Sequence, residues 1–388
     1  MTAPAVVLTG DPTTRAEVTT VGVEEEFLLV ECGSHLPARH GPAVVEAAAA
    51  VLGDQVQTEF FASQAEVCSS PTRSLDALRA ELGRLRAVLR EAATAAGCLL
   101  VGSGTPVVAG GTPPVTGSAR YRRIRVHVGS VATAPDGSVS GCHIHVGVRD
   151  RAQALALNRL IRPWLPVVQA LAVNSPFSCG RDTGFASWRH PAYRRWPTVG
   201  PAPVVDEAGY LATVGALLDS RVILDPAMLY WYSRPSEHVP TLEIRIADTS
   251  ADLDTTVLLA ALVRALASVF LAELRSEPDG AGPEARSPGT ALVDAAHWAS
   301  ARHGLHGAGP HPATGLVQPM RVLVDALVER ALPGLDAAGD TPFVLRTLGT
   351  LLSHGTGADR QRAVYGRRGR LGDVVGHLAE ATAAGAAG

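Results

Sequence analysis

The chain has 388 residues, of which 46% are hydrophobic and 18% charged, with a formal net charge of -3. This composition is typical of globular proteins and excludes disordered and fibrous classes. No basic cluster is long enough to follow a phosphate backbone, so we expect no nucleic-acid partner. All 34 basic residues are arginine, which excludes mechanisms that need a lysine amine, such as the P-loop and Schiff bases.

Cysteine spacing and hydropathy indicate the cellular compartment in which the protein is expected. The five cysteines are widely spaced and form no C-x-x-C pair, so we expect reduced thiols rather than disulfides or a zinc ribbon. Residues 1–17 lack a basic segment and a sustained apolar run, and Arg264 interrupts the most apolar later segment, 257–274. The sequence therefore predicts a cytoplasmic protein without a membrane partner.

The first predicted elements are a strand and a helix. Residues 18–30 alternate in polarity, which predicts a strand with Glu24 and Glu26 on one face. Residues 74–96 carry leucines at helical spacing behind Ser74, a suitable N-cap, and predict an amphipathic helix.

The middle of the chain predicts short strands, loops and one interrupted helix. Further strands are predicted at residues 98–102, 138–148, 229–233 and 241–247, and loops rich in Gly and Pro at 102–117 and 174–203. A helix that begins near Arg151 must be kinked or split by Pro163 and Pro166.

From residue 253 onward the pattern is helical. Helices are predicted at residues 255–273, 291–303, 317–331, 342–354 and 359–379, and the Ala/Gly-rich tail 381–388 is expected to fray. No linker divides the chain. We therefore predict a single domain over 1–388, with a sheet-rich core at about 18–250 and a mainly helical part at 251–385.

Four segments place polar side chains at positions i and i+2. These pairs are Glu24 and Glu26, Gln64 and Glu66, His143 and His145, and Glu243 and Arg245. Side by side, such strands would give one polar, carboxylate-rich face and one apolar face that helices would cover. The carboxylates would repel one another unless cations neutralised them.

The expected donor atoms indicate which cation would bind. Oxygen ligands with one or two imidazoles and no thiolate favour magnesium or manganese over zinc, and such ions suit phosphoryl transfer. Each pair alone also has a structural interpretation: a solvated strand edge, two hydrogen-bonded histidines or an ion pair. The coincidence of all four pairs in one chain favours a site.

Seven motifs occur in order over most of the chain. They are T-V-G-V-E-E-E-F (20–27), G-C-H-I-H-V-G-V (141–148), N-S-P-F (174–177), G-R-D-T-G-F-A-S-W-R (180–189), L-Y-W-Y-S-R-P-S (229–236), T-L-E-I-R-I-A-D (241–248) and G-T-G-A-D-R-Q-R (355–362). Together they resemble the glutamate-cysteine ligase type 2 family of carboxylate-amine ligases.

The resemblance implies a fold and an activity. The fold would be α+β and glutamine-synthetase-like: a curved, mainly antiparallel sheet forming a funnel, backed by helices, with a helical C-terminal part. ATP would enter at one end and the carboxylate substrate at the other. The enzyme would be an ATP-dependent carboxylate-amine ligase that forms an amide of the γ-glutamyl-cysteine type through an acyl phosphate, with Mg²⁺ or Mn²⁺ assisting.

The same resemblance implies roles for individual residues. Glu24, His143 and Glu243 would hold the metal that orients the ATP phosphates, while Glu26, Glu59 and Glu66 would hold ions nearer the acyl phosphate. Arg245 would bind the transferring phosphoryl group, so that Arg245 and Glu243 form the catalytic pair. By motif position, candidates to bind substrate carboxylates or the triphosphate are Arg181, Arg189, Arg234, Asn174 and Trp188. The alternation of side chains along the predicted strands also puts the paired residues on one face of the sheet. Glu59 would need a bend in the chain to share that face.

Two departures from the family pattern lie beside the expected funnel. Residues 126–140 read as a hairpin-like insert that turns at 135–137. Around Glu66 the usual Q-V-E-V-A-T-P is Q-A-E-V-C-S-S-P. Both leave the expected metal ligands intact but leave open which carboxylate and which amine are the substrates.

Other functions remain open at this point. One is a specialised biosynthetic amide ligase with a non-glutamate substrate. Another is a metal-dependent hydrolase built on His143 and His145, and a third is a catalytically silent binding protein, which the complete ligand set disfavours. We expect small-molecule carboxylate and amine partners, and the apolar C-terminal helices make a homodimer an additional expectation.

Overall fold

The computed structural model describes residues 17–108, 110–111, 114–134, 136–276 and 288–385. Its centre is a seven-stranded sheet in the order β2-β3-β1-β5-β9-β8, with β4 also paired to β1. All of these pairs are antiparallel. The sheet strands are β1 (Val21–Glu31), β2 (Val56–Thr58), β3 (Gln64–Cys68), β4 (Cys98–Val101), β5 (Gly141–Gly147), β8 (Ser233–Pro235) and β9 (Thr241–Asp248).

Helices surround this sheet. They are α1 (Gly41–Leu52), α2 (Leu75–Ala95), α3 (Ala119–Val128), α4 (Arg151–Ile161), α5 (Leu165–Ala172), α6 (Arg189–Tyr193), α7 (Glu207–Asp219), α8 (Leu253–Ser276), α9 (Thr290–His303), α10 (Met320–Ala338), α11 (Thr341–His354), α12 (Gly357–Arg368) and α13 (Leu371–Ala384). Two small two-stranded sheets pair β6 (Phe177–Ser178) with β7 (Arg181–Asp182), and β10 (Ala308–Pro310) with β11 (Val317–Pro319).

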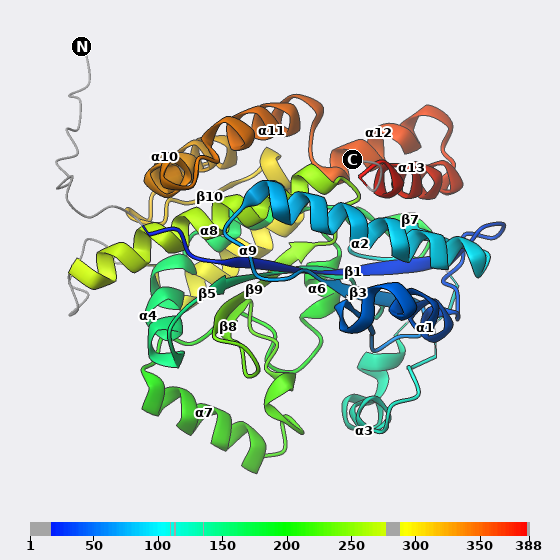
Figure 1. Cartoon of the computed structure of the whole chain (residues 1–388), viewed down its shortest axis with the longest axis horizontal. Helices are drawn as coiled ribbons and strands as arrows, with labels where there is room; N and C mark the ends of the chain where they lie inside the picture. Colours follow the sequence, from blue (N-terminus) through cyan, green and yellow to red (C-terminus); the bar gives the residue numbers. More distant parts are fainter. Residues whose placement is uncertain (1–16, 109, 112–113, 135, 277–287, 386–388) are drawn as a thin grey trace.

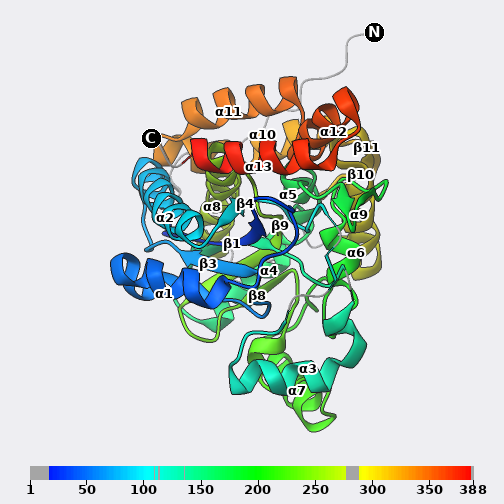
Figure 2. The same cartoon turned by 90° about the vertical axis from the view of Figure 1, so that its right-hand side faces the viewer.

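The helices divide into two groups around the sheet. Figures 1 and 2 show α2, α8, α10, α11 and α13 on one side, while α3 and α7 project on the other. Side chains along β1 alternate between the two faces of the sheet. Val21, Val23 and Phe27 point toward the helical layer and form one core with residues of α2 and α8. The α+β prediction, with an antiparallel sheet backed by helices, is therefore confirmed.

Two features of the helical layer follow from local sequence. The Ser74 hydroxyl accepts a hydrogen bond from the Ala77 amide at 3.2 Å, so α2 begins at the predicted cap. Helix α8 is long and apolar enough to cross a membrane, yet 89% of its most apolar window is buried inside the protein. Such burial is what a core helix of a folded domain requires.

Several predicted elements agree with the structure and several are wrong. The proline-rich segment splits the helix at Arg151 into α4 and α5, as predicted. Residues 126–140 do not form a hairpin: α3 extends to Val128, a 3₁₀ turn covers Gly129–Thr133, and Pro135 lies outside the described residues. The helical turns use local hydrogen bonds and leave no partner strand for a hairpin.

Three further boundaries differ. Most of 229–233 is not a strand, because β8 starts only at Ser233. Residues 317–319 form β11 before α10 begins, and the helix predicted at 359–379 is two helices separated at Gly369. Gly369 has a φ of 65°, a left-handed conformation that ends α12 and that glycine adopts readily. Residues 381–384 continue α13 rather than fray, whereas 386–388 lie outside the described residues.

Candidate active site

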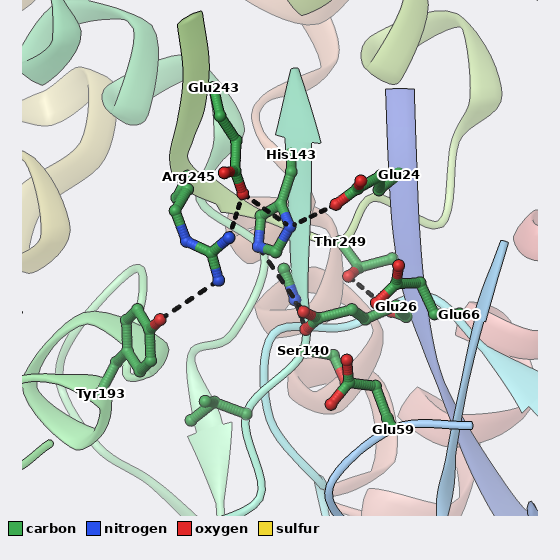
Figure 3. A network of polar contacts seen from close by, with 12 residues as sticks. Glu24, Glu26, Glu59, Glu66, Ser140, His143, Tyr193, Glu243, Arg245 and Thr249 are labelled. Atoms are coloured by element: carbon green, nitrogen blue, oxygen red, sulfur yellow. Dashed lines mark hydrogen bonds and ion pairs between the residues drawn. The ribbon is translucent and has the colours of Figure 1, made fainter. Parts of the chain in front are cut away.

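The register of four adjacent strands builds a polar face on the sheet. Glu26 on β1 is the direct cross-strand partner of Glu66 on β3. On the other edge of β1, Glu24 pairs with His143 of β5. The neighbouring pair on the β5 and β9 strands is His145 with Glu243. The predicted juxtaposition of these strands is therefore present. Figure 3 shows the side chains of Glu24, Glu26, Glu66, His143, Glu243 and Arg245 gathered on this face.

A first cluster consists of three carboxylates. Ligand oxygens of Glu26, Glu59 and Glu66 lie within 4.8 Å of one another. Glu59 follows β2 at the point where the chain reverses into β3. This reversal is the bend that Glu59 needs in order to reach the polar face. Burial raises the pKa of Glu26, and burial together with Glu24, Glu59 and Glu26 raises that of Glu66 well above its usual value.

A second cluster combines carboxylates with imidazoles. Ligand atoms of Glu24, His145 and Glu243 lie within 4.8 Å of one another. His143 Nδ1 lies 3.0 Å from Glu24 Oε2 and 3.8 Å from Glu243 Oε1, while its Nε2 lies 3.5 Å from Glu26 Oε1. His143 thus stands between the two clusters. His145, whose part the sequence left open, converges with the second cluster through an Nε2 to Oε1 distance of 3.1 Å to Glu24.

Glu243 is held by two arginines. Arg234 on β8 donates from Nε to Glu243 Oε2 at 2.9 Å, and Arg245 pairs with the other carboxylate oxygen. Although burial opposes the charge, these guanidinium groups lower the pKa of Glu243 to about 2. Glu243 therefore forms an ion pair with Arg245 and at the same time belongs to the group of possible metal ligands.

A cavity of about 180 Å³ opens beside the first cluster. Its polar lining includes Glu26, Glu59, His143, Arg189 and Arg245. The remaining lining is mostly aromatic or aliphatic: Phe60, Phe61, Tyr121, Ile124, Val139, Trp196, Ala227 and Tyr230. Two members of the carboxylate cluster and two arginines thus line the same cavity.

The two arginines of this cavity are anchored by the protein. Arg189 at the start of α6 is 4% exposed, donates to the Arg245 carbonyl at 3.2 Å and lies over the Tyr193 ring. Arg245 reaches the Tyr193 hydroxyl at 3.5 Å. The Nε atoms of both arginines are buried without a hydrogen-bond partner, so each retains donor capacity.

The other candidates from motif position lie elsewhere. Arg181 and Trp188 line a separate cavity of about 260 Å³ with Asp136, to which the indole donates at 3.1 Å. The Asn174 amide donates to the carbonyls of Gly102 and Thr249 and accepts from Gln361. These contacts indicate that Asn174 holds neighbouring segments of the chain together. Ligand binding by Arg181 and Trp188 stays a prediction.

Sequence reasoning missed two residues of the site. Cys68 lies two residues after Glu66 on the same face, and its thiol donates to Glu66 Oε1 at 3.3 Å. Burial raises the pKa of Cys68, which keeps the thiol protonated. Extending the i, i+2 pattern by one step would have found it. Tyr193 carried no such signal, because α6 lies within the segment predicted as irregular.

Two solved structures share the fold of this chain. The fold matches the structure of a glutamate-cysteine ligase from Francisella tularensis in complex with AMP, with a TM-score of 0.68 at 12% identity over 95% of this chain and 89% of that one. A bifunctional glutathione synthetase from Pasteurella multocida matches with a TM-score of 0.64 at 14% identity, covering 95% of this chain and 52% of that one. The glutamine-synthetase-like ligase fold is thus confirmed.

Sequence comparison then gives the family. Residues 20–377 match the model of glutamate-cysteine ligase family 2, and the chain belongs to this family. It is 41% identical to "Putative glutamate--cysteine ligase 2" of Salinispora tropica, over 94% of this chain and 95% of that protein. It is 43% identical to "Putative glutamate--cysteine ligase 2-1" of Saccharopolyspora erythraea, over 92% and 93%. The predicted class, an ATP-dependent ligase that forms amide bonds, is confirmed.

Proposed function

We propose that this ligase activates a carboxylate as an acyl phosphate and transfers the acyl group to an amine in the cavity beside Glu26. The observation that carries this proposal is that Glu26 and Glu59, whose carboxylates converge with that of Glu66, line one cavity together with Arg245 and Arg189. Carboxylates that can hold metal ions, next to anchored guanidinium groups, suit phosphoryl transfer, because the cations would neutralise the charge on the phosphate oxygens.

The residues present fit divalent metal ions. The Nε2 atoms of His143 and His145 are buried without a hydrogen-bond partner, although carboxylate oxygens lie close to both. Carboxylates packed together in a buried site repel one another unless cations are present. Magnesium or manganese suits the mostly oxygen donors, although the Cys68 thiol lies close to Glu24 and Glu66 in a third group of possible ligand atoms.

The proposed ligands follow the two clusters. Glu26, Glu59 and Glu66 would hold the ions nearer the acyl phosphate; Glu24 and Glu243, with His143 or His145, would hold the ion at the ATP phosphates. When bound, such ions neutralise charge on phosphate oxygens during transfer. We also propose that Glu243 keeps Arg245 oriented toward the cavity.

The chain's own residues then position the reactants. A substrate carboxylate oxygen attacks the γ-phosphorus and ADP leaves; an amine next displaces phosphate and loses a proton, which leaves the amide. Arg245 and Arg189 would bind the transferring phosphoryl oxygens with planar, two-pronged donors. Arg234 supports this arrangement through its hydrogen bond to Glu243.

Glutamate and cysteine are the first substrates to test, because relatives carry those names. We also propose that residues 1–388 work as one catalytic domain, since α8 packs on the sheet that carries the site. The cytoplasmic location predicted from the sequence is part of the same proposal.

An ADP-release assay over pairs of carboxylates and amines tests this function. With magnesium, we expect ADP release that needs both substrates and stops on addition of a chelator. The hydrolase alternative predicts instead that zinc stays bound through dialysis and that hydrolysis proceeds without ATP. ATP-independent amide hydrolysis by the zinc-loaded protein would replace the ligase proposal.

A further inference from the structure

The cavity beside Glu26 has two chemically different kinds of lining. The carboxylates of Glu26 and Glu59 and the guanidinium groups of Arg189 and Arg245 share it with a larger set of rings and aliphatic side chains. This apolar wall is not needed to bind a phosphoryl group. Its composition therefore bears on the organic substrate.

The apolar wall contains a connected set of rings, those of Phe60, Phe61, Tyr121, Trp196 and Tyr230. Phe60 makes edge contacts with Phe61, Tyr121 and Trp196 at centroid distances of 4.9, 5.4 and 5.3 Å. Trp196 in turn meets Tyr230 at 5.8 Å. Edge contacts of this kind hold the rings in place, so the wall presents a preformed apolar surface.

The charged groups next to this wall already have partners. Arg120 makes two hydrogen bonds of 2.9 Å to Asp225, and a Glu59 carboxylate oxygen accepts from the Phe60 amide at 2.6 Å. Burial raises the pKa of Tyr121 and Tyr230, so their hydroxyl groups stay neutral. A zwitterionic amino-acid group placed here would lose its hydration without gaining matched partners.

We propose that the acid activated by this enzyme is an amphiphilic carboxylic acid with an aromatic or other apolar body, rather than glutamate. Its carboxylate lies near Arg245, and its body lies against Phe60, Trp196 and Tyr230. This inference rests on the proposed function and specifies the substrate class of the same site. Glutamate in the same orientation would direct its charged α-amino and α-carboxylate groups toward the rings.

A substrate panel tests the inference. With ATP, magnesium and hydroxylamine as a small acceptor, we expect kcat/KM for 3-phenylpropionate to exceed that for glutamate by about tenfold or more, the scale on which apolar pockets discriminate. Trp196→Leu should lower kcat/KM for 3-phenylpropionate by about tenfold or more while the KM for ATP changes less than about twofold. Tyr121→Leu, at the half-buried edge of the wall, provides a second variant should Trp196→Leu fail to fold.

Tyr365→Leu is the matched control, because Tyr365 packs against Phe177 away from this cavity. It should leave kcat/KM unchanged for both acids. A rise in the KM for ATP alone in Trp196→Leu would show that the rings bind the nucleotide base and would overturn the inference. A preference for glutamate that the wall variants do not alter would also overturn it, while the ligase function would stand.

Calorimetric binding separates failure of the inference from failure of the function. If no acid yields ADP or hydroxamate, the proposed function fails. Binding of 3-phenylpropionate that is stronger than that of glutamate and weakened in Trp196→Leu would still support the substrate class. Equal or weaker binding of 3-phenylpropionate would overturn the inference.

Discussion

Glu26 and Glu66 face each other across the β1 and β3 pair, and burial raises the pKa of both carboxyl groups. Like charges directly opposite in a sheet are destabilising. Sequence alternation puts both side chains on the polar face, so the pairing is a consequence of strand register. The proposed divalent ions would relieve this repulsion, and the predictions below follow from that relationship.

Removal of the metal should weaken nucleotide binding. Because the carboxylate-rich face would repel a triphosphate, we expect the affinity for ATP measured by calorimetry to fall by at least about tenfold when a chelator replaces magnesium. Glu26→Gln removes one of the opposed charges and should reduce this metal dependence. Equal affinity in magnesium and in chelator would contradict the proposed ion sites.

Adjacent glutamates on opposite faces should behave differently. Glu25 is fully buried and accepts hydrogen bonds from Arg86 at 2.8 and 2.5 Å, so Glu25→Ala would leave the buried Arg86 charge without its carboxylate, with only neutral hydrogen-bond partners. We expect a loss of about 3 to 5 kcal/mol in the free energy of unfolding, measured in urea. Glu24→Gln should lower turnover but leave stability within about 1 kcal/mol. Similar stability losses in both variants would contradict this division of the strand.

Arg245 should not be replaceable by lysine. A point ammonium does not reproduce a planar donor for phosphate oxygens, so Arg245→Lys should lower kcat nearly as far as Arg245→Ala, by about a hundredfold or more. Arg368→Lys, in an exposed pair with Asp373, serves as the control. If the lysine variant kept most of its activity, Arg245 would be only an ion-pair partner of Glu243.

Stability should fall in mild acid because of two buried histidines. Burial, with Arg194 and Arg189 nearby, lowers the pKa of His190 to about 3, and burial also lowers that of His297. Below pH 6.5 the unfolded chain binds protons that the folded chain excludes, so stability is present above that pH and is lost as the pH falls toward 3. The slope is up to about 1.4 kcal/mol per pH unit for each histidine.

Urea unfolding from pH 7 to 4.5 measures this loss. His190→Gln should flatten the pH dependence, whereas His306→Gln, at a residue exposed to solvent, is its control. An unchanged slope in His190→Gln would show that other groups carry the acid sensitivity.

Local patterns in the sequence contained much of the polar face. Alternation alone placed Glu24 and Glu26 together, and the motifs gave His143 and Arg245. Glu59 could not be placed, since its position depends on how the chain reverses between β2 and β3. The partner of Glu25 was equally hidden, because Arg86 is 61 residues away and only packing of α2 on the sheet brings the two together. The segment before β5, predicted as a hairpin-like insert, instead forms helical turns at its start, which no strong periodicity in the sequence indicates.

Trapping of the acyl phosphate tests the central claim most directly. Hydroxylamine is small enough to attack an activated carbonyl whichever amine is natural, and a cavity that excludes water should limit hydrolysis of the intermediate. With ATP, magnesium and a carboxylate substrate, we predict about one ADP per hydroxamate formed, and loss of both products in Glu26→Gln and Glu66→Gln. Metal-dependent release of ADP without any hydroxamate, over a broad panel of carboxylates, would contradict the acyl-phosphate mechanism.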